Sequence, residues 1–171
     1  MSDTETEETK KNNPLDLLPK SEMSLDAIKR GYNDHKKTDQ KFFLSESFAA
    51  QFDATGFSIY QSMYKYNDDF TGRPDFVNRN AVNGIIHNLE DSRKYAFGTL
   101  SILDVDGEKK EIIGYWILRG NQPIKDVFEG FLEDNLWAQL PTGKETYEKL
   151  NEAFYSENLN NKPIEHRSVF L

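Results

Sequence analysis

Residues 95–118 read YAFGTLSILDVDGEKKEIIGYWIL, two hydrophobic runs separated by a polar turn. The runs 95–103 and 111–118 are rich in aromatic and β-branched residues, which favour strands. Between them stands Asp106-Gly107, a residue pair typical of tight β-hairpin turns. The stretch therefore predicts two antiparallel strands joined as a hairpin.

Helical signals precede this hairpin. Ser24 is a suitable N-cap for a short helix through residue 30, and we expect Gly31 to end that helix in the left-handed conformation. A second helix is predicted over 39–52, because its apolar residues recur every four positions. These residues are Leu44, Phe48 and Phe52.

Residues 57–66 change to a two-residue alternation, which predicts a strand. A further helix is indicated by an apolar stripe with helical spacing. The stripe consists of Val82, Ile85, Ile86 and Leu89. Thr142 and Glu145 have the spacing of a capping box and predict the start of another helix. Residues 158–171 are largely polar, end in Val169-Phe170-Leu171 and carry no strand prediction.

About four helices around an antiparallel sheet indicate an α+β fold with the helices covering the sheet. A chain of 171 residues is most simply a single domain. Residues 1–13 hold no large apolar residue after Met1, so they cannot offset the entropy cost of ordering. We therefore expect 1–22 to be a disordered acidic tail or linker and 23–171 to be the folded domain.

Composition excludes several classes of function. The net charge is −8, which repels nucleic-acid phosphates over long range and argues against direct nucleic-acid binding. The sequence has no cysteine, so disulfides and thiol catalysis are excluded. No apolar run reaches the roughly 20 residues that span a bilayer, and the acidic start is not a secretory signal. The expected location is cytoplasmic.

Motifs that could carry chemistry have simpler explanations. Residues 104–108 resemble the start of a calcium loop, but the sixth position is Lys109 and the twelfth is Tyr115, where that loop needs Gly and Glu. A hairpin turn is the preferred interpretation. Glu90 and Asp91 are adjacent, so on a helix they point about 100° apart and cannot act on one substrate. We predict no catalytic, cofactor-binding or metal-binding residue.

Aromatic residues are abundant in the predicted strands. If Tyr60, Tyr64 and Tyr66 share one face, that face could stack on nucleobases or anchor a peptide. The same residues could equally pack beneath a covering helix, and this interpretation is favoured because a sheet with helices on it needs apolar faces.

Several segments together resemble one known family, the C-terminal domain of eukaryotic elongation factor 1-gamma. They are LPKS at 18–21, KRGYN at 29–33, FDATGFS at 52–58, YKYND at 64–68, RKYAFG at 93–98 and IGYWILRGNQ at 113–122. Members of this family carry a glutathione-transferase-like domain and a charged linker ahead of the matching part. We therefore expect this chain to be either an excised portion or a stand-alone relative.

The resemblance implies an α+β domain without catalytic residues or cofactors. It implies a non-catalytic scaffold or protein-interaction module of the elongation factor 1B complex, which supports translation elongation, with proteins of the elongation machinery as partners. The alternative is a stand-alone relative that binds RNA or protein outside that complex.

Exposed positions near the predicted strand ends are the candidate partner contacts, chosen for charge and aromatic character. They are Lys65, Tyr66, Arg93, Lys94 and Arg119.

Overall fold

The computed structural model describes residues 21, 23–120 and 131–171. Its strands are β1 (Phe57–Tyr64), β2 (Ala96–Asp104), β3 (Lys110–Arg119), β4 (Asn135–Leu140), β5 (Asn158–Leu159) and β6 (Lys162–Phe170). Its α-helices are α2 (Leu25–Lys36), α3 (Glu46–Gln51), α4 (Asp75–Asn88) and α5 (Lys144–Tyr155). Short 3-10 turns are η2 (Phe42–Leu44), η3 (Asn67–Phe70), η4 (Glu90–Tyr95) and η6 (Leu132–Asp134).

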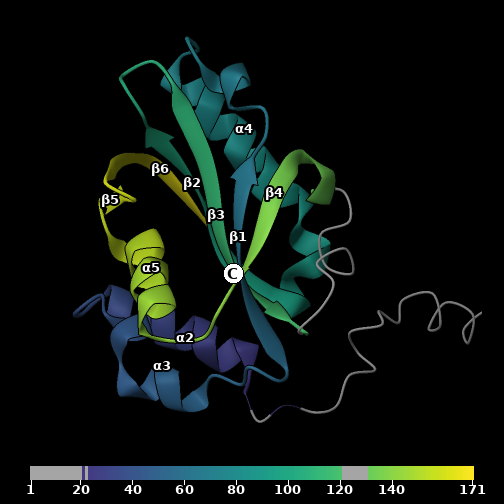
Figure 1. Cartoon of the computed structure of the whole chain (residues 1–171), viewed down its shortest axis with the longest axis vertical. Coiled ribbons are helices and arrows are strands. Elements are labelled where there is room, and N and C mark those ends of the chain that lie inside the picture. The colour runs from purple at the N-terminus through teal and green to yellow at the C-terminus, as the bar shows by residue number, and fades with distance from the viewer. Residues whose placement is uncertain (1–20, 22, 121–130) are drawn as a thin grey trace, which may run out of the picture.

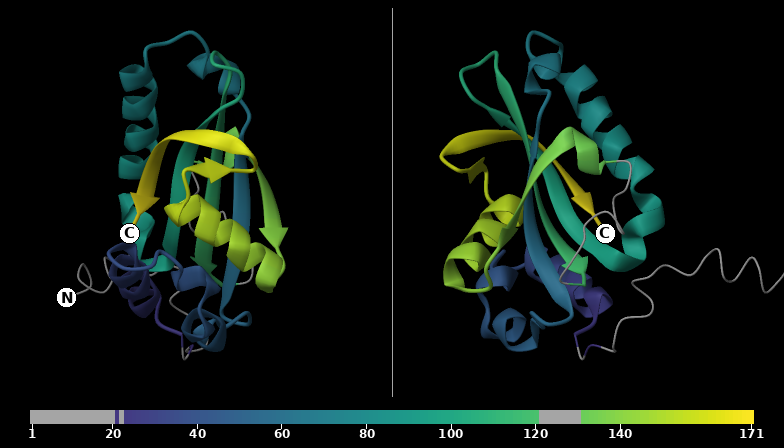
Figure 2. Two further views of the ribbon diagram at one scale, coloured as in Figure 1. Left: turned by 90° about the vertical axis from the view of Figure 1, so that its left-hand side faces the viewer. Right: turned by 45° about the vertical axis from the view of Figure 1, so that its right-hand side comes forward.

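The described strands form one antiparallel sheet in the order β4-β1-β3-β2-β6-β5, with helices on both faces (Figure 1). This is a single α+β unit, so the predicted fold class is confirmed. The expected tail, 1–22, lies outside the described residues except for Ser21. The two sides of the sheet are seen best in Figure 2, where α5 and β5 lie in front of the strands in the left view.

The predicted hairpin is confirmed and lies inside the sheet. β2 and β3 pair from Ala96 opposite Leu118 to Asp104 opposite Lys110. Gly107 has φ 92°, a conformation that favours glycine. The turn thus uses its glycine as the sequence suggests, and it places β3 between β1 and β2.

One face of the sheet, the α5 face, is covered by α2, η2, α3 and α5. Its strand residues include Phe57, Ile59, Phe97, Ile113, Tyr115 and Ile117. The covering side chains are largely aromatic: the Phe43 ring centroid lies 4.7 Å from that of Phe154 and 6.3 Å from that of Phe97. Aromatic pairs at such distances stabilise a core beyond their buried area.

The opposite face, the α4 face, is covered in part by α4, which contacts β2 and β6. Trp116 is fully buried here, and its indole Nε1 donates a hydrogen bond to Ser62 Oγ at 2.9 Å. Gly98 and Gly114 lie against the indole, where a Cβ atom on either would collide with it. The predicted stripe of α4 packs on this face: Val82, Ile85, Ile86 and Leu89.

The first helix is longer than the sequence predicted. Ser24 caps it as expected, because its Oγ accepts a hydrogen bond from the Ala27 amide at 3.3 Å. The helix then continues through Gly31 to Lys36, so the prediction that Gly31 ends it was wrong. A Cβ at Gly31 would overlap the ring of Phe42. The glycine is therefore explained by close packing.

The prediction of one helix over 39–52 was also wrong. Gln40 has φ 56°, which is incompatible with a continuous helix. Ser45 then separates η2 from α3 and caps α3, since its Oγ accepts a hydrogen bond from the Phe48 amide at 3.2 Å. Phe48 is buried, whereas Leu44 is 48% exposed. The four-residue repeat was therefore only partly a core pattern.

The C-terminal part corrects two further expectations. α5 begins after Gly143, which has φ 151° and makes no side-chain capping bond, so the capping box of Thr142 and Glu145 is wrong. Residues 158–171 supply β5 and β6, which the sequence analysis did not predict. β6 is held by its antiparallel pairing with β2, so its strand character comes from a partner distant in sequence.

Candidate partner-binding surfaces

The five predicted contact residues fall at two opposite ends of the sheet. Lys65 and Tyr66 follow the last residue of β1. Arg119 lies opposite Phe57, the first residue of β1. At about 3.3 Å per strand residue, these two ends are roughly 25 Å apart. Arg93 lies just before β2, at the same end as Arg119. The residues therefore form two surfaces.

The Tyr66 surface consists of Lys65, Tyr66 and Arg73 on an aromatic base. Tyr66 is 49% exposed, and its ring meets that of Tyr64 edge-on at 5.6 Å. The Tyr64 ring is 5.7 Å from that of Phe70, which the Arg73 guanidinium covers at 5.2 Å. An exposed tyrosine that rests on a half-buried ring can contribute contact area at low entropy cost.

Local structure fixes the chain on both sides of Tyr66. The Lys65 amide donates a hydrogen bond to the Asp134 carbonyl at 2.9 Å. The Asn67 side-chain carbonyl accepts a hydrogen bond from the Ile112 amide at 3.0 Å. These bonds tie the segment to β3 and to the residue before β4, so the exposed tyrosine sits on a rigid support.

The three tyrosines after Phe57 do not share one environment. Tyr60 and Tyr64 are half-buried and pack against the core of the α4 face. Burial raises the pKa of both phenols above the usual value. The core-packing interpretation is thus confirmed for Tyr60 and Tyr64, whereas Tyr66 lies beyond the strand on the surface.

At the opposite end, the cationic side chains make contacts within the domain. Arg93 Nε donates to the Leu171 carbonyl at 3.1 Å, and the Lys29 ammonium donates to the Arg93 carbonyl at 2.8 Å. The Lys94 ammonium lies 5.7 Å from the ring centroid of Tyr95. Arg93 and Lys94 remain exposed, so their polar groups can also reach a partner.

Arg119 has a more internal role at this end. Its guanidinium donates to the Gly56 carbonyl at 2.5 Å and covers the Phe57 ring at 5.2 Å. Nearby, Asp53 accepts hydrogen bonds from Ser21 Oγ at 2.6 Å and from the Thr55 amide at 3.0 Å. The half-buried Arg119 therefore holds the turn before β1 against the end of β3.

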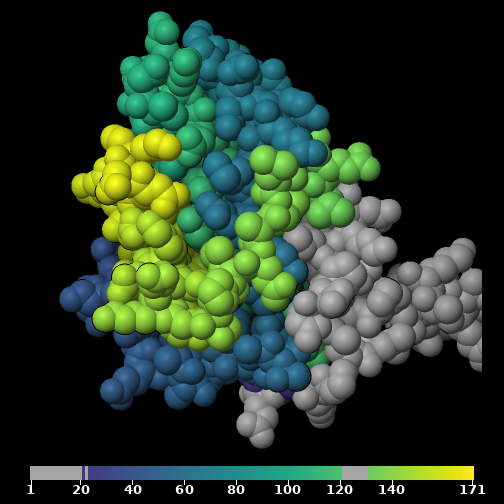
Figure 3. All heavy atoms as spheres, in the orientation of Figure 1, coloured from purple at the N-terminus to yellow at the C-terminus, as the bar shows by residue number. Residues whose placement is uncertain are grey.

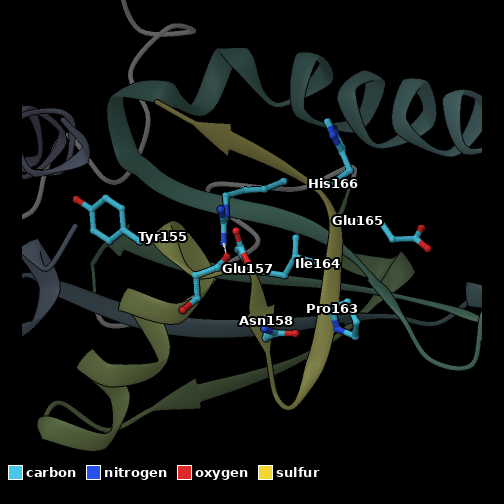
Figure 4. Close-up of a pocket in the computed structure, with 9 residues that line it drawn as sticks. Tyr155, Glu157, Asn158, Pro163, Ile164, Glu165 and His166 are labelled. Atoms are coloured by element: carbon cyan, nitrogen blue, oxygen red, sulfur yellow. Dashed lines mark hydrogen bonds between the residues drawn. The ribbon is translucent and has the colours of Figure 1, made fainter. Parts of the chain in front are cut away.

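Sequence analysis missed two depressions in the C-terminal part. The first, about 520 Å³, lies where α5 leads into β5 and β6 (Figure 4). Its Arg167 guanidinium donates to the carbonyls of Ala153 at 2.6 Å, Glu152 at 3.2 Å and Ser156. These carbonyls belong to the end of α5, which a cation stabilises. The pocket is therefore organised around a helix cap.

The second depression, the α5 cleft, is about 550 Å³ and lies between α5 and the sheet. Gln61, Tyr115 and Leu140 line it from the strands. Three glutamates line it from the helix: Glu145, Glu148 and Glu152. The sequence does place these three glutamates together, because positions 145, 148 and 152 share one side of a helix. No local pattern indicates that this side of the helix lies against β1 and β4.

The motif that resembles a calcium loop forms a hairpin turn. Asp104 and Asp106 accept hydrogen bonds from the amides of Gly107 and Lys109, each at 2.7 Å, so the loop is a hairpin turn. Hydrogen bonds from the amides of Lys109 and Glu108 hold the pKa of Asp106 below its usual value. Across residues 21, 23–120 and 131–171, no group of three or more potential metal ligands comes together.

The length and polarity of a helix decide whether it can span a membrane. In the part of the chain that the structure describes, no helix combines the length and the apolar character needed to cross a bilayer.

The sheet, its two helical layers and its open surface depressions define a small α+β domain. The family model for elongation factor 1 gamma, conserved domain, matches residues 10–122. The chain therefore belongs to the elongation factor 1-gamma family. The match contains all five predicted contact residues, and it ends before β4, α5, β5 and β6.

Individual relatives agree with this assignment. Elongation factor 1-gamma from Trypanosoma cruzi is 37% identical over 113 residues, covering 66% of this chain and 26% of that protein. Elongation factor 1-gamma from Prunus avium is 37% identical over 118 residues, 69% of this chain and 27% of that protein. The Drosophila melanogaster protein of the same name is 30% identical over 154 residues, which cover 87% of this chain and 34% of that protein. The chain thus spans about a quarter to a third of these relatives.

Proposed function

We propose that this chain is a non-catalytic interaction module of the cytoplasmic translation elongation machinery, acting as a scaffold for protein partners. The observation that carries this proposal is the family match over residues 10–122. The named relatives are elongation factors. The matched region contains β1, β2 and β3 together with the predicted contact residues at both sheet ends.

The geometry supports a scaffold in a specific way. Arg93, Lys94 and Arg119 make up the second surface, named the Arg93–Lys94 surface. It lies roughly 25 Å from the Tyr66 surface on the same sheet. Two partners can therefore contact the domain at the same time without competing for one site. Lys65 and Tyr66 are the proposed contacts at one end, and Arg93, Lys94 and Arg119 are those at the other.

The first test is affinity capture with the whole chain as bait, followed by identification of bound proteins by mass spectrometry. We expect elongation factors among the bound proteins. The double variant Lys65→Glu with Tyr66→Ala should lower their recovery at least about fivefold, since central aromatic contacts often contribute more than 1 kcal/mol.

The matched control is Leu44→Ala, which also truncates an exposed hydrophobic side chain, 48% exposed, but in η2, which contacts α2, α3 and α5. It should leave recovery unchanged. If elongation factors are absent from the bound fraction of the unmodified chain, or if both variants lose them equally, the proposed role is wrong.

A further inference from the structure

A strip of apolar side chains continues the α5 cleft along the sheet. On the α5 face, Met63 of β1 lies opposite Leu136 of β4, and Gln61 lies opposite Ala138. Met63 is 38% exposed and Leu136 is 62% exposed, and Ala138 is also exposed. Met63, Leu136 and Ala138 are referred to as the bare strip. These neighbouring side chains on one sheet face offer apolar area that a partner could cover.

The helix wall beside the strip is acidic. Glu145 and Glu148 are exposed, and Glu152 is half-buried. The basic residue among them, Lys149, donates to Asn160 Oδ1 at 2.9 Å and lies 3.7 Å from Glu152. Three carboxylates therefore face the cleft with one ammonium group that is already engaged.

We propose that the α5 cleft and the bare strip form a docking groove for a segment of a protein partner in which apolar side chains alternate with Lys or Arg. The apolar side chains would cover Met63 and Leu136, and the cations would meet the carboxylates of α5. Strand-like spacing suits the groove, because its floor is itself made of two strands with a two-residue repeat.

Charge decides which occupant fits. A second copy of this chain would bring a net charge of −8 and the same acidic wall, so self-association through the groove is opposed by like charges. An acidic segment is opposed for the same reason. A segment that is both basic and apolar complements the acidic helix wall and the bare strip. Opposite charges also increase its association rate and its specificity.

This inference goes beyond the proposed role in elongation and does not depend on it. The bare strip borders the Tyr66 surface, because Met63 lies two residues before Lys65, and the Lys65 amide bonds to Asp134, two residues before Leu136. The α5 wall of the groove lies outside residues 10–122, the region that the family model matches.

The test uses three fluorescein-labelled twelve-residue peptides and the full chain. One peptide alternates Leu with Lys, one Leu with Glu, and one Ser with Lys. Fluorescence anisotropy measures affinity, and amide chemical shifts locate the site. We expect saturable binding of the Leu–Lys peptide alone, with the largest shifts at Met63, Leu136, Ala138 and Glu148.

Charge-neutralising variants distinguish the effect of the carboxylates in the groove from the effect of the net charge of the whole chain. Glu145→Gln with Glu148→Gln should weaken binding about threefold to tenfold, since each exposed charge pair makes only a modest contribution. Glu90→Gln with Asp91→Asn removes the same charge from exposed residues far along the chain and should leave affinity unchanged. Circular dichroism confirms that each variant is folded.

Apolar variants test the strip in the same assay. Leu136→Ser should weaken binding severalfold, whereas Leu44→Ser removes a comparably exposed leucine outside the groove and should have no effect. Any of three results overturns the proposal: no saturable binding of the Leu–Lys peptide, equal binding of the Leu–Glu peptide, or equal losses in both neutralised pairs. Dimerisation in sedimentation equilibrium that Leu136→Ser abolishes would instead assign the groove to a second copy.

Discussion

Ile59 and Met63 lie on the same face of β1, yet their environments differ completely. Ile59 is 1% exposed and belongs to the core under the covering helices, whereas Met63 is 38% exposed. Their partners on β4 follow the same division, because Leu140 packs against the core and Leu136 is 62% exposed. One sheet face thus has a packed region and a bare strip.

The comparison shows what a two-residue pattern can predict. Alternation on a strand indicates which side chains share a face. Whether another element covers that face depends on segments far along the chain, here α5. The packed region should therefore contribute most of the stability, and the bare strip should contribute almost none. Four experiments follow in order of decreasing expected effect, and the first and last of them test this division directly.

The largest loss should follow Phe43→Ala. Phe43 is fully buried in the packed region, against Phe154 at 4.7 Å and Phe48 at 5.1 Å between ring centroids. Removing a buried phenylalanine ring costs about 3–5 kcal/mol. Urea denaturation measures the loss. The neighbouring exposed Leu44, changed to Ala, should cost less than about 0.5 kcal/mol, and equal losses would contradict the assignment of the core.

A smaller loss is expected from Arg167→Met, which keeps an apolar stem but leaves the carbonyls at the end of α5 without their donor. Unpaired, part-buried carbonyls cost about 1–3 kcal/mol. The matched change Arg30→Met, at an exposed position on α2, should be close to neutral in the same denaturation experiment. A neutral result at Arg167 would mean that α5 is held on the sheet by its apolar side alone.

A pH effect should come from His166 on the α4 face. Burial, and then the Arg79 charge, lower the pKa of His166 below its usual value of 6.5. The unfolded chain therefore binds more protons than the folded chain just below pH 6.5, so stability should fall as the pH is lowered through this window. The expected loss of stability is small because the imidazole of His166 is only half-buried.

The measurement compares unfolding midpoints at pH 7.5 and 5.5 for the unmodified chain and for His166→Gln. The glutamine variant should lose less stability on acidification. An identical pH dependence in both proteins would show that burial and the Arg79 charge do not lower the pKa of His166.

The smallest effect should be that of Leu136→Ser on stability. At 62% exposure, the side chain has little contact to lose, and exposed substitutions are usually within about 0.5 kcal/mol of neutral. Thermal unfolding checks this. A loss above about 1 kcal/mol would make the strip part of the core and would erase its difference from the packed region.

Local signals predicted the hairpin well, because Asp106-Gly107 and its flanking strands specify their own pairing. They failed where the cause was distant. Gly31 has the residue type of a helix end but serves the close approach of Phe42. β6 has a polar sequence, and only its pairing with β2 reveals it as a strand.

The candidate contacts show the same limit. Tyr66 was identified as an exposed aromatic residue from sequence, and its exposure is confirmed. Arg119 looks equivalent in sequence, yet its guanidinium is bonded to the Gly56 carbonyl. The α5 cleft could not be predicted, because it forms only where α5 meets β1 and β4.

Trp116 and its two flanking glycines carry a consequence for how this sequence can change over generations. Because a methyl group at position 98 or 114 would collide with the indole, these three positions cannot drift independently. Enlarging either glycine first produces a collision with the indole, and also with the Tyr115 carbonyl at position 98 or Ser62 Oγ at position 114. Shrinking Trp116 first leaves a cavity. The order in which substitutions arise is therefore constrained at the centre of the sheet.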